Sequence, residues 1–301
     1  MKVDTDLEVR AFAPGHVTGI FAPATEAHDP RARGSRGAGL VLELGVHARV
    51  RYRPGGARRI RVESDAGGAL PISTEVARRL APSSGSTRLY LSHQLPVGQG
   101  FGTSAAGATA TALALARLAP WPRREAVATA HLADLFGGGG LGGVAAILGG
   151  GLELRRRAGV PPWGVVDHLE IDRPLLIAVV GGPMLSPRYL RDPRVLDRIR
   201  RASGELDELF ADPSLDEFLE VSERFTDRAG LASKEVAWLV SGLRRRGARA
   251  AQAMFGRSVF AVPRSDRARL GIVRWLERGG VRAVELRGAR RGARASRPQP
   301  F

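Results

Sequence analysis

Apolar and polar residues alternate over two neighbouring segments in the first half of the chain. Residues 40–53 carry apolar side chains at alternate positions, and residues 59–63 repeat the pattern over a shorter length. A period of two is typical of a strand with one buried face. The intervening turn, Pro54-Gly55-Gly56, predicts that the two strands form a hairpin.

The remaining segments alternate between the two kinds of secondary structure. Strands are predicted at 88–91, 152–155, 165–171, 175–180, 258–262 and 281–286. Helices are predicted at 74–80, 103–118, 123–136, 144–148, 193–202, 214–229, 231–246 and 266–278. The glycine-rich run 137–143 interrupts this pattern. The mixture predicts an α+β fold, with helices dominating after a boundary near residue 172.

Three regions follow from this pattern. We expect an N-terminal lobe over residues 1–171 and a C-terminal lobe over residues 172–287. Residues 288–301 are rich in arginine and end in two prolines, and we expect this tail to be disordered.

Composition limits the class of protein. The chain has 301 residues, of which 44% are hydrophobic, enough for a large core in one or two lobes. It has no cysteine, which excludes disulfides and thiolate metal sites. No run of eighteen apolar residues predicts a membrane-spanning helix, and the first residues lack an apolar signal region. A cytoplasmic protein is therefore expected.

The formal net charge is +16, which is typical of some nucleic-acid-binding proteins. Here the charge is almost entirely arginine, scattered along the chain, with lysine only at Lys2 and Lys234. That composition indicates a GC-rich genome more than a designed basic face. We therefore expect no nucleic-acid partner, because a small anionic substrate and a nucleotide use a positive field equally well. The chain has no asparagine and four glutamines, so our hypothesis is a thermophilic source.

A glycine loop provides the most specific chemical signal. It joins the strand at 88–91 to an alanine-rich helix and contains Gly98, Gly100 and Gly102. Glycines let a backbone turn tightly and approach a ligand, and the free N–H groups of a helix start bind anions. Thr103 and Ser104 stand where a helix N-cap belongs. The loop has no P-loop lysine, so it predicts a phosphate site of another kind or, alternatively, a turn that caps a core helix.

The loop resembles the second motif of the GHMP kinases, which reads P-x-x-x-G-x-G-S-S-A-A. The matching residues are Pro96, Gly100, Gly102, Ser104, Ala105 and Ala106, with Thr103 in place of the first serine. Residues 13–19 and 251–261 resemble the first and third motifs of the same family. Residues 14–21, 34–39, 140–146 and 149–151 are similar to the archaeal pantoate kinases within it. The resemblance covers roughly residues 8–262.

This resemblance implies a fold and an activity. The fold would be that of the GHMP kinases, with an N-terminal lobe like ribosomal protein S5 domain 2 and a ferredoxin-like C-terminal lobe. The activity would be ATP- and Mg²⁺-dependent phosphorylation of the 4-hydroxyl of pantoate, giving 4-phosphopantoate for coenzyme A biosynthesis. A homodimer would also fit the family. The alternatives are another GHMP small-molecule kinase and a nucleotide-binding relative without catalysis.

The resemblance also assigns the ATP site. The residues expected around the ATP phosphates are Pro96, Gly98, Gly100, Gly102, Thr103, Ser104 and Ala105. Ser104 and Asp134 are the expected Mg²⁺ ligands, with Asp134 where the family usually has glutamate. Magnesium tolerates the shorter side chain because it retains water ligands. The alternative for Ser104 is a simple N-cap, and for Asp134 a solvated helix charge.

Position 143 departs from the family pattern. The family has an aspartate after Gly-Leu-Gly, commonly proposed as the base that takes the hydroxyl proton, whereas this chain has Gly143. Loss of a general base typically costs about 10²–10⁴ in rate. Three explanations stay open: Asp134 serves as metal ligand and base, the γ-phosphate or a water takes the proton, or the chain is non-catalytic.

Four residues, Arg155, Arg36, His131 and His28, are expected to bind the substrate, and His16 is a further possible contact. Arg155 matches an arginine position of the pantoate kinases, and its guanidinium could bind a carboxylate bidentately. Arg36 is a second candidate for that role, and either arginine could instead be a solvated charge. His131 could bind a substrate oxygen, or be a core or Asp134-paired histidine. His28 stands where the family often has a hydroxyl residue, and His16 could touch substrate or triphosphate.

Overall fold

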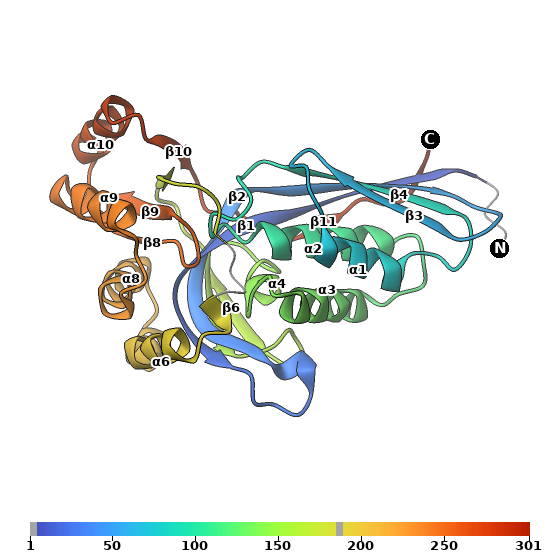
Figure 1. Cartoon of the computed structure of the whole chain (residues 1–301), viewed down its shortest axis with the longest axis horizontal. Coiled ribbons are helices and arrows are strands. Elements are labelled where there is room, and N and C mark those ends of the chain that lie inside the picture. The colour runs from blue at the N-terminus through green and yellow to red at the C-terminus, as the bar shows by residue number, and fades with distance from the viewer. Residues whose placement is uncertain (1–4, 185–188) are drawn as a thin grey trace.

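The computed structural model describes residues 5–184 and 189–301, and it contains two β-sheets with helices against both (Figure 1). The predicted α+β class is confirmed. Strand β6 of the first sheet ends at Leu169 and strand β7 of the second begins at Leu175, on either side of residue 172, although residues 294–300 return to the first sheet. None of the described helices is long and apolar enough to cross a membrane.

Two long strands form the backbone of the first sheet. Strand β1 (Leu7–Ala24) and strand β2 (Gly34–Arg53) pair antiparallel along most of their length, with the short helix η1 (Pro30–Ala32) in the connection between them. The end of β2 pairs with β4 (Ser86–His93), and its beginning pairs with β5 (Leu152–Arg157). Strand β6 (Val165–Leu169) pairs with β5.

The predicted hairpin between residues 40–53 and 59–63 is wrong. Strand β3 (Arg59–Ser64) does not pair with β2, because β4 lies between them. Strands β3 and β4 are parallel, and helix α1 (Pro71–Leu80) makes the crossover that parallel strands require. The alternation of apolar residues identified both strands, but it does not identify the neighbour of each.

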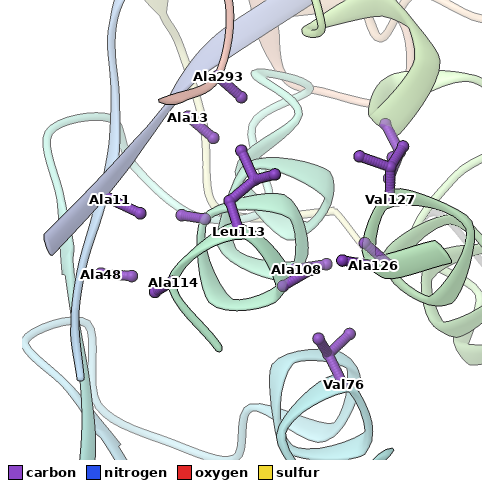
Figure 2. Close-up of a cluster of buried hydrophobic side chains, with 14 of the residues drawn as sticks. Ala11, Ala13, Ala48, Val76, Ala108, Leu113, Ala114, Ala126, Val127 and Ala293 are labelled. Carbon is purple, nitrogen blue, oxygen red and sulfur yellow. The ribbon is translucent and has the colours of Figure 1, made fainter. Parts of the chain in front are cut away.

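Three helices cover one face of this sheet (Figure 1). They are α1, α2 (Thr103–Leu115) and α3 (Arg123–Gly137), and the short α4 (Gly143–Ala146) follows them. Helix α2 is buried on all sides, which its alanine-rich sequence permits because small side chains let neighbouring elements approach closely. Figure 2 shows Ala114 of α2 facing Ala11 and Ala48 of the sheet, and Ala108 facing Ala126 of α3. This packing fixes the start of α2 relative to β1.

The second sheet has the strand order β10-β7-β9-β8, with all neighbours antiparallel. Its strands are β7 (Leu175–Val179), β8 (Ala248–Gln252), β9 (Ser258–Pro263) and β10 (Arg282–Leu286). The helices around it are α6 (Pro193–Ala202), η2 (Ser203–Glu205), α7 (Leu206–Ala211), α8 (Leu215–Ala229), α9 (Lys234–Arg245) and α10 (Asp266–Arg278).

The two faces of the second sheet belong to different cores. Alternate residues such as Ile177 and Phe260 pack with Phe218 of α8 and with β1, which joins the second lobe to the first. Their neighbours Leu176 and Ala261 pack instead with α9 and α10. The lobes are therefore connected through β1, whose two ends lie in different cores.

The C-terminal tail is ordered, contrary to the prediction. Strands β11 (Arg294–Ala295) and β12 (Gln299–Pro300) pair antiparallel with the edge of β1. The backbone N–H of Ala293 donates to the carbonyl of Ile147 at 2.9 Å. The open edge of β1 supplies backbone partners that composition does not reveal, and these hold an arginine-rich segment in place.

Candidate active site

A cavity lies where the start of α2, the glycine run after α3, strands β1 and β5, and the β8–β9 turn come together. We call it the central cavity. Its lining residues are His16, Thr18, Phe21, Ser35, Gly100, Gly102, Ser104, Ala105, Asp134, Gly139, Gly140, Leu141, Gly142, Gly143, Arg155, Met254 and Phe255. The segments that the sequence identified as three separate motifs therefore meet in one place.

The glycine loop reaches the cavity in a left-handed conformation. Gly100 and Gly102 have φ values of 75° and 63°, which favour glycine. Gly102, and not Thr103 or Ser104, is the N-cap of α2, and no side chain caps the helix. The expectation of a side-chain cap is thus wrong, and the first N–H groups of α2 have no acceptor within the helix. Free N–H groups of this kind are able to bind an anion, and these lie beside the cavity.

The β8–β9 turn locks this loop in position. A side chain at Gly100 would meet the Met254 carbonyl at 2.7 Å, so the two backbones are in direct contact. The Ser258 hydroxyl donates to the carbonyl of Gln99, and the Gln99 side-chain amide donates to the carbonyl of Gly181. The second lobe therefore holds the loop of the first.

Three of the residues expected around phosphate do not line the cavity. Pro96 is exposed, and the Gly98 carbonyl accepts a hydrogen bond from the backbone of Met184. Thr103 is buried at the first turn of α2. Gly100, Gly102, Ser104 and Ala105 are the members of the predicted set that reach the cavity.

Ser104 and Asp134 meet at the wall of the cavity. The Ser104 hydroxyl donates to Asp134 Oδ1 at 2.8 Å, and the Asp134 side chain is almost fully buried. Burial raises the pKa of Asp134 from 3.8 to about 7, and the hydrogen bond from Ser104 opposes this only in part. No histidine pairs with this carboxyl among the described residues, so Asp134 is a buried acid that lacks a cation.

A divalent cation fits this position. Two hard oxygen donors stand side by side, and Mg²⁺ commonly takes one or two protein oxygens and completes its shell with waters and substrate phosphates. No cluster of three or more histidine or acidic residues that could hold a metal occurs within residues 5–184 and 189–301. The site is therefore suited to a metal that arrives with a phosphate ligand, not to an all-protein cage.

The glycine run packs directly against this pair. A side chain at Gly139 would meet Asp134 Oδ1 at 1.9 Å and Ser104 Oγ at 2.5 Å. We therefore expect Gly139→Ala to displace the Asp134 side chain. If the cavity is an active site, the kcat of its reaction should fall by about 10²-fold, which is typical when a catalytic group is misplaced by about 1 Å.

Steady-state kinetics of Gly139→Ala and Gly271→Ala test this expectation. Gly271 lies on α10 with open space at its Cβ position, so its alanine variant should keep the wild-type rate. Equal rates for the two variants would show that Asp134 is not confined by the glycine run.

Arg155 belongs to a buried cluster with two other ionisable residues. Its guanidinium contacts Glu153 Oε1, and the same oxygen lies 2.8 Å from His16 Nε2. Arg155 and Glu153 are 2% and 0% exposed. Arg155 Nε and Glu153 Oε2 have no hydrogen-bond partner within the described chain. Arg155 and His16 also line the central cavity, so this buried cluster is accessible to a ligand bound there.

The other predicted substrate residues lie elsewhere. His28 is exposed in the turn before η1 and does not line the cavity. Arg36 forms an ion pair with Asp207 and lies over the ring of Phe210. Its guanidinium is therefore bound at the surface of the lobe and does not face the cavity. His131 Nε2 lies 3.0 Å from the Arg33 carbonyl. Donation to that carbonyl fixes His131 to the connection between β1 and β2, away from the cavity.

Gly143 lines the cavity at the first turn of α4. A Cβ atom there would lie 2.7 Å from the Cβ of Ala105, so α4 and α2 are in close contact at this point. No carboxylate stands at this position to accept a proton. Arg156 and Arg157, the neighbours of Arg155, contact Asp167 and the Trp163 carbonyl and do not line the cavity.

Sequence reasoning missed part of the cavity. Phe255 lines it with a φ of 61°, and its ring packs edge-on against Phe21 at 5.5 Å. Glu153 belongs to none of the sequence motifs. It lies two residues before Arg155 on a predicted strand, and residues two apart on a strand share a face, so this spacing could have identified it.

The buried Asp134 also predicts how the stability of the metal-free protein depends on pH. The unfolded chain releases this proton near pH 4 and the folded chain near pH 7, so the folded state binds more protons between these values. The contribution of Asp134 to the free energy of unfolding therefore decreases as the pH rises from 4 to 7, by about 4 kcal/mol in total. Urea unfolding of wild type and Asp134→Asn at pH 5 and pH 8, without divalent cations, measures it.

The variant should gain more stability relative to wild type at pH 8 than at pH 5, because asparagine carries no charge to desolvate. A difference between the two proteins that does not change with pH would show that Asp134 ionises normally.

Comparison with known proteins places this arrangement in a family. Residues 71–151 match the family model described as GHMP kinases N terminal domain. The pantoate kinase of Thermococcus kodakarensis is 32% identical over 273 residues, covering 86% of this chain and 89% of its own length. The pantoate kinase of Methanospirillum hungatei is 28% identical, covering 84% and 87%.

Solved structures show the same fold. A phosphotransferase related to the coenzyme A biosynthesis pathway superimposes with a TM-score of 0.87 at 28% identity, covering 96% of this chain and 99% of that one. A homoserine kinase from Cytophaga hutchinsonii superimposes with a TM-score of 0.65 at 16% identity, covering 100% and 99%, and supports the fold alone.

Proposed function

Because this chain belongs to the pantoate kinases of the GHMP kinase family, we propose that it transfers the γ-phosphate of ATP to the 4-hydroxyl of pantoate. The product would be 4-phosphopantoate, an intermediate on the way to coenzyme A. The observation that supports this most directly is that a helix-start anion site and a buried arginine line the same cavity.

The ATP phosphates are assigned to the start of α2. The free N–H groups after Gly102 provide donors for the phosphate oxygens, and Gly100 keeps the backbone close. Ser104 and Asp134 would hold Mg²⁺, which when bound neutralises phosphate charge. A cation there also offsets the burial of Asp134 and favours its ionised form.

The acceptor is assigned to the opposite side of the cavity. Pantoate carries a carboxylate, two hydroxyls and a pair of methyl groups on one carbon. The Arg155 guanidinium can bind the carboxylate, while the Phe21 and Phe255 rings offer an apolar wall for the methyl groups. Phosphoryl transfer depends mainly on positioning and charge neutralisation, which this arrangement supplies.

³¹P NMR tests the proposed function. Purified protein would be incubated with Mg²⁺ and ATP, and with pantoate, homoserine, mevalonate or no acceptor. A phosphomonoester that forms only with pantoate supports the proposal. ATP binding without product from any acceptor would favour a non-catalytic relative, and product from another acceptor would favour a different GHMP kinase.

A further inference from the structure

His16 and Glu153 form a buried pair at the wall of the central cavity. His16 lies on β1 and Glu153 on β5, and both strands pair with β2. Gly39 of β2 lies between the two residues and places no side chain between them. A side chain at Gly39 would meet His16 Nε2 at 2.4 Å and Glu153 Oε1 at 2.8 Å. The two side chains are 4% and 0% exposed. The glycine therefore allows an imidazole and a carboxylate to meet across the middle strand.

The distances determine which imidazole nitrogen carries hydrogen. His16 Nε2 lies 2.8 Å from Glu153 Oε1 and 3.4 Å from the guanidinium nitrogen Nη1 of Arg155. A carboxylate oxygen only accepts, so the shorter contact requires Nε2–H to donate to Glu153. The neutral ring then has its lone pair on Nδ1. No residue within 5–184 or 189–301 forms a hydrogen bond to Nδ1.

The cavity offers few proton acceptors. Its ionisable lining residues in the described chain are His16, Asp134 and Arg155. An arginine guanidinium has no acceptor for a proton, and Asp134 faces Ser104 at the proposed metal position. Position 143, which carries the family carboxylate, is glycine. His16 is the remaining group able to take a proton from a hydroxyl bound in this cavity.

We propose that His16, oriented by Glu153, is the proton acceptor for the substrate hydroxyl in this chain. The inference rests on the proposed function, because it needs a hydroxyl acceptor in the central cavity. It differs from the expectation for the family, where the residue at position 143 is the proposed base.

The proposed step is balanced as follows. The acceptor hydroxyl oxygen forms a bond to the γ-phosphorus as the bond from that phosphorus to the bridging oxygen of ADP breaks. The hydroxyl proton passes to His16 Nδ1, which becomes an imidazolium, and ADP leaves with the electron pair of the broken bond. Glu153 stabilises the new positive charge through Nε2–H. Solvent takes the proton after the product leaves.

The surroundings keep His16 neutral before the step. Burial lowers its pKa below 6.5, and Arg155 and His168 add to this, while the Glu153 carboxylate acts in the opposite direction. Among the described residues, Asp134 is the acidic residue that lines the cavity. The unprotonated ring is thus the resting form at neutral pH, as a base requires.

Kinetics of two His16 variants test the inference. Glutamine at position 16 can still donate to Glu153 but cannot accept a proton, so His16→Gln should lower kcat by about 10²–10⁴-fold. The fall in wild-type kcat that protonation of His16 causes at acidic pH should disappear in this variant. In His16→Ala, added imidazole should restore activity in proportion to its unprotonated fraction, which a purely structural role of His16 would not explain.

The controls separate this inference from the proposed function. His47→Gln, on the exposed part of β2, should keep the wild-type rate and pH profile. If wild type phosphorylates pantoate and His16→Gln retains its rate and its acidic fall, or if imidazole gives no rescue of His16→Ala, the inference is overturned. If wild type gives no pantoate-dependent product, the proposed function fails, and this inference fails with it.

Discussion

Replacement of Asp134 by asparagine is expected to lower kcat for pantoate phosphorylation by about 10²–10³-fold. The amide keeps the hydrogen bond from Ser104 but removes the negative charge that would hold Mg²⁺ against the phosphates. The magnitude is that typically seen when one preorganised electrostatic group is removed from an active site. The same variant should be more stable than wild type at pH 8 without metal, so loss of rate could not be attributed to unfolding.

Measurement of kcat and of the Mg²⁺ concentration for half-maximal rate tests this expectation. Asp207→Asn is a suitable control, because Asp207 is 79% exposed and its ion pair with Arg36 lies at the surface. A wild-type rate and an unchanged Mg²⁺ requirement in Asp134→Asn would remove Asp134 from the proposed metal site.

The second large effect is expected at Arg155, on stability as well as on binding. Arg155→Met leaves the Glu153 carboxylate buried with a single neutral partner, His16. Removal of one member of a buried ion pair typically costs about 3–5 kcal/mol, and we expect a loss of unfolding free energy in that range. The variant should also lose pantoate affinity, because the buried cation for the carboxylate is gone.

A double variant separates the two effects. In Arg155→Met/Glu153→Gln no buried charge is left without a partner, so most of the lost stability should return. The KM for pantoate should stay high, since no cation has been restored. Denaturant unfolding and steady-state kinetics measure the two quantities.

Arg156→Met is the matched control for this series, because Arg156 is the next residue of β5 and its pair with Asp167 is partly exposed. Its cost should be below about 1 kcal/mol, with little change in KM. A double variant with the wild-type KM would show that Arg155 supports the fold but does not bind the substrate.

The sequence determined most of the secondary structure and the fold class, because both depend on local patterns. Helices over 193–202 and 266–278 appear with the predicted bounds. Strand β1 was missed, since Pro14 and Gly15 interrupt its alternation and the register shifts at that point. The helix predicted at 144–148 is a single turn over Gly143–Ala146.

The loop of Gly100 and Gly102 and the pairing of Ser104 with Asp134 were within reach of the sequence. The glycines have the left-handed φ that the loop needs, and a motif fixes the distance along the chain from loop to helix. The sequence could not predict which of the three consecutive arginines, Arg155 to Arg157, is buried. Arg155 is buried because Glu153, two residues away on β5, shares its face, and because His16 on β1 and Gly39 on β2 complete the cluster.

Tertiary structure also decided the fates of Arg36, His131 and the tail. Each is held by a partner distant in sequence: Asp207, the Arg33 carbonyl and the edge of β1. The sequence by itself determined which segments become helix or strand and where a phosphate can approach the backbone, because these follow from interactions between near neighbours in the chain. The assembly of the central cavity and the charge state of the groups in it depend on burial and on contacts between distant segments, and only the folded structure supplies those.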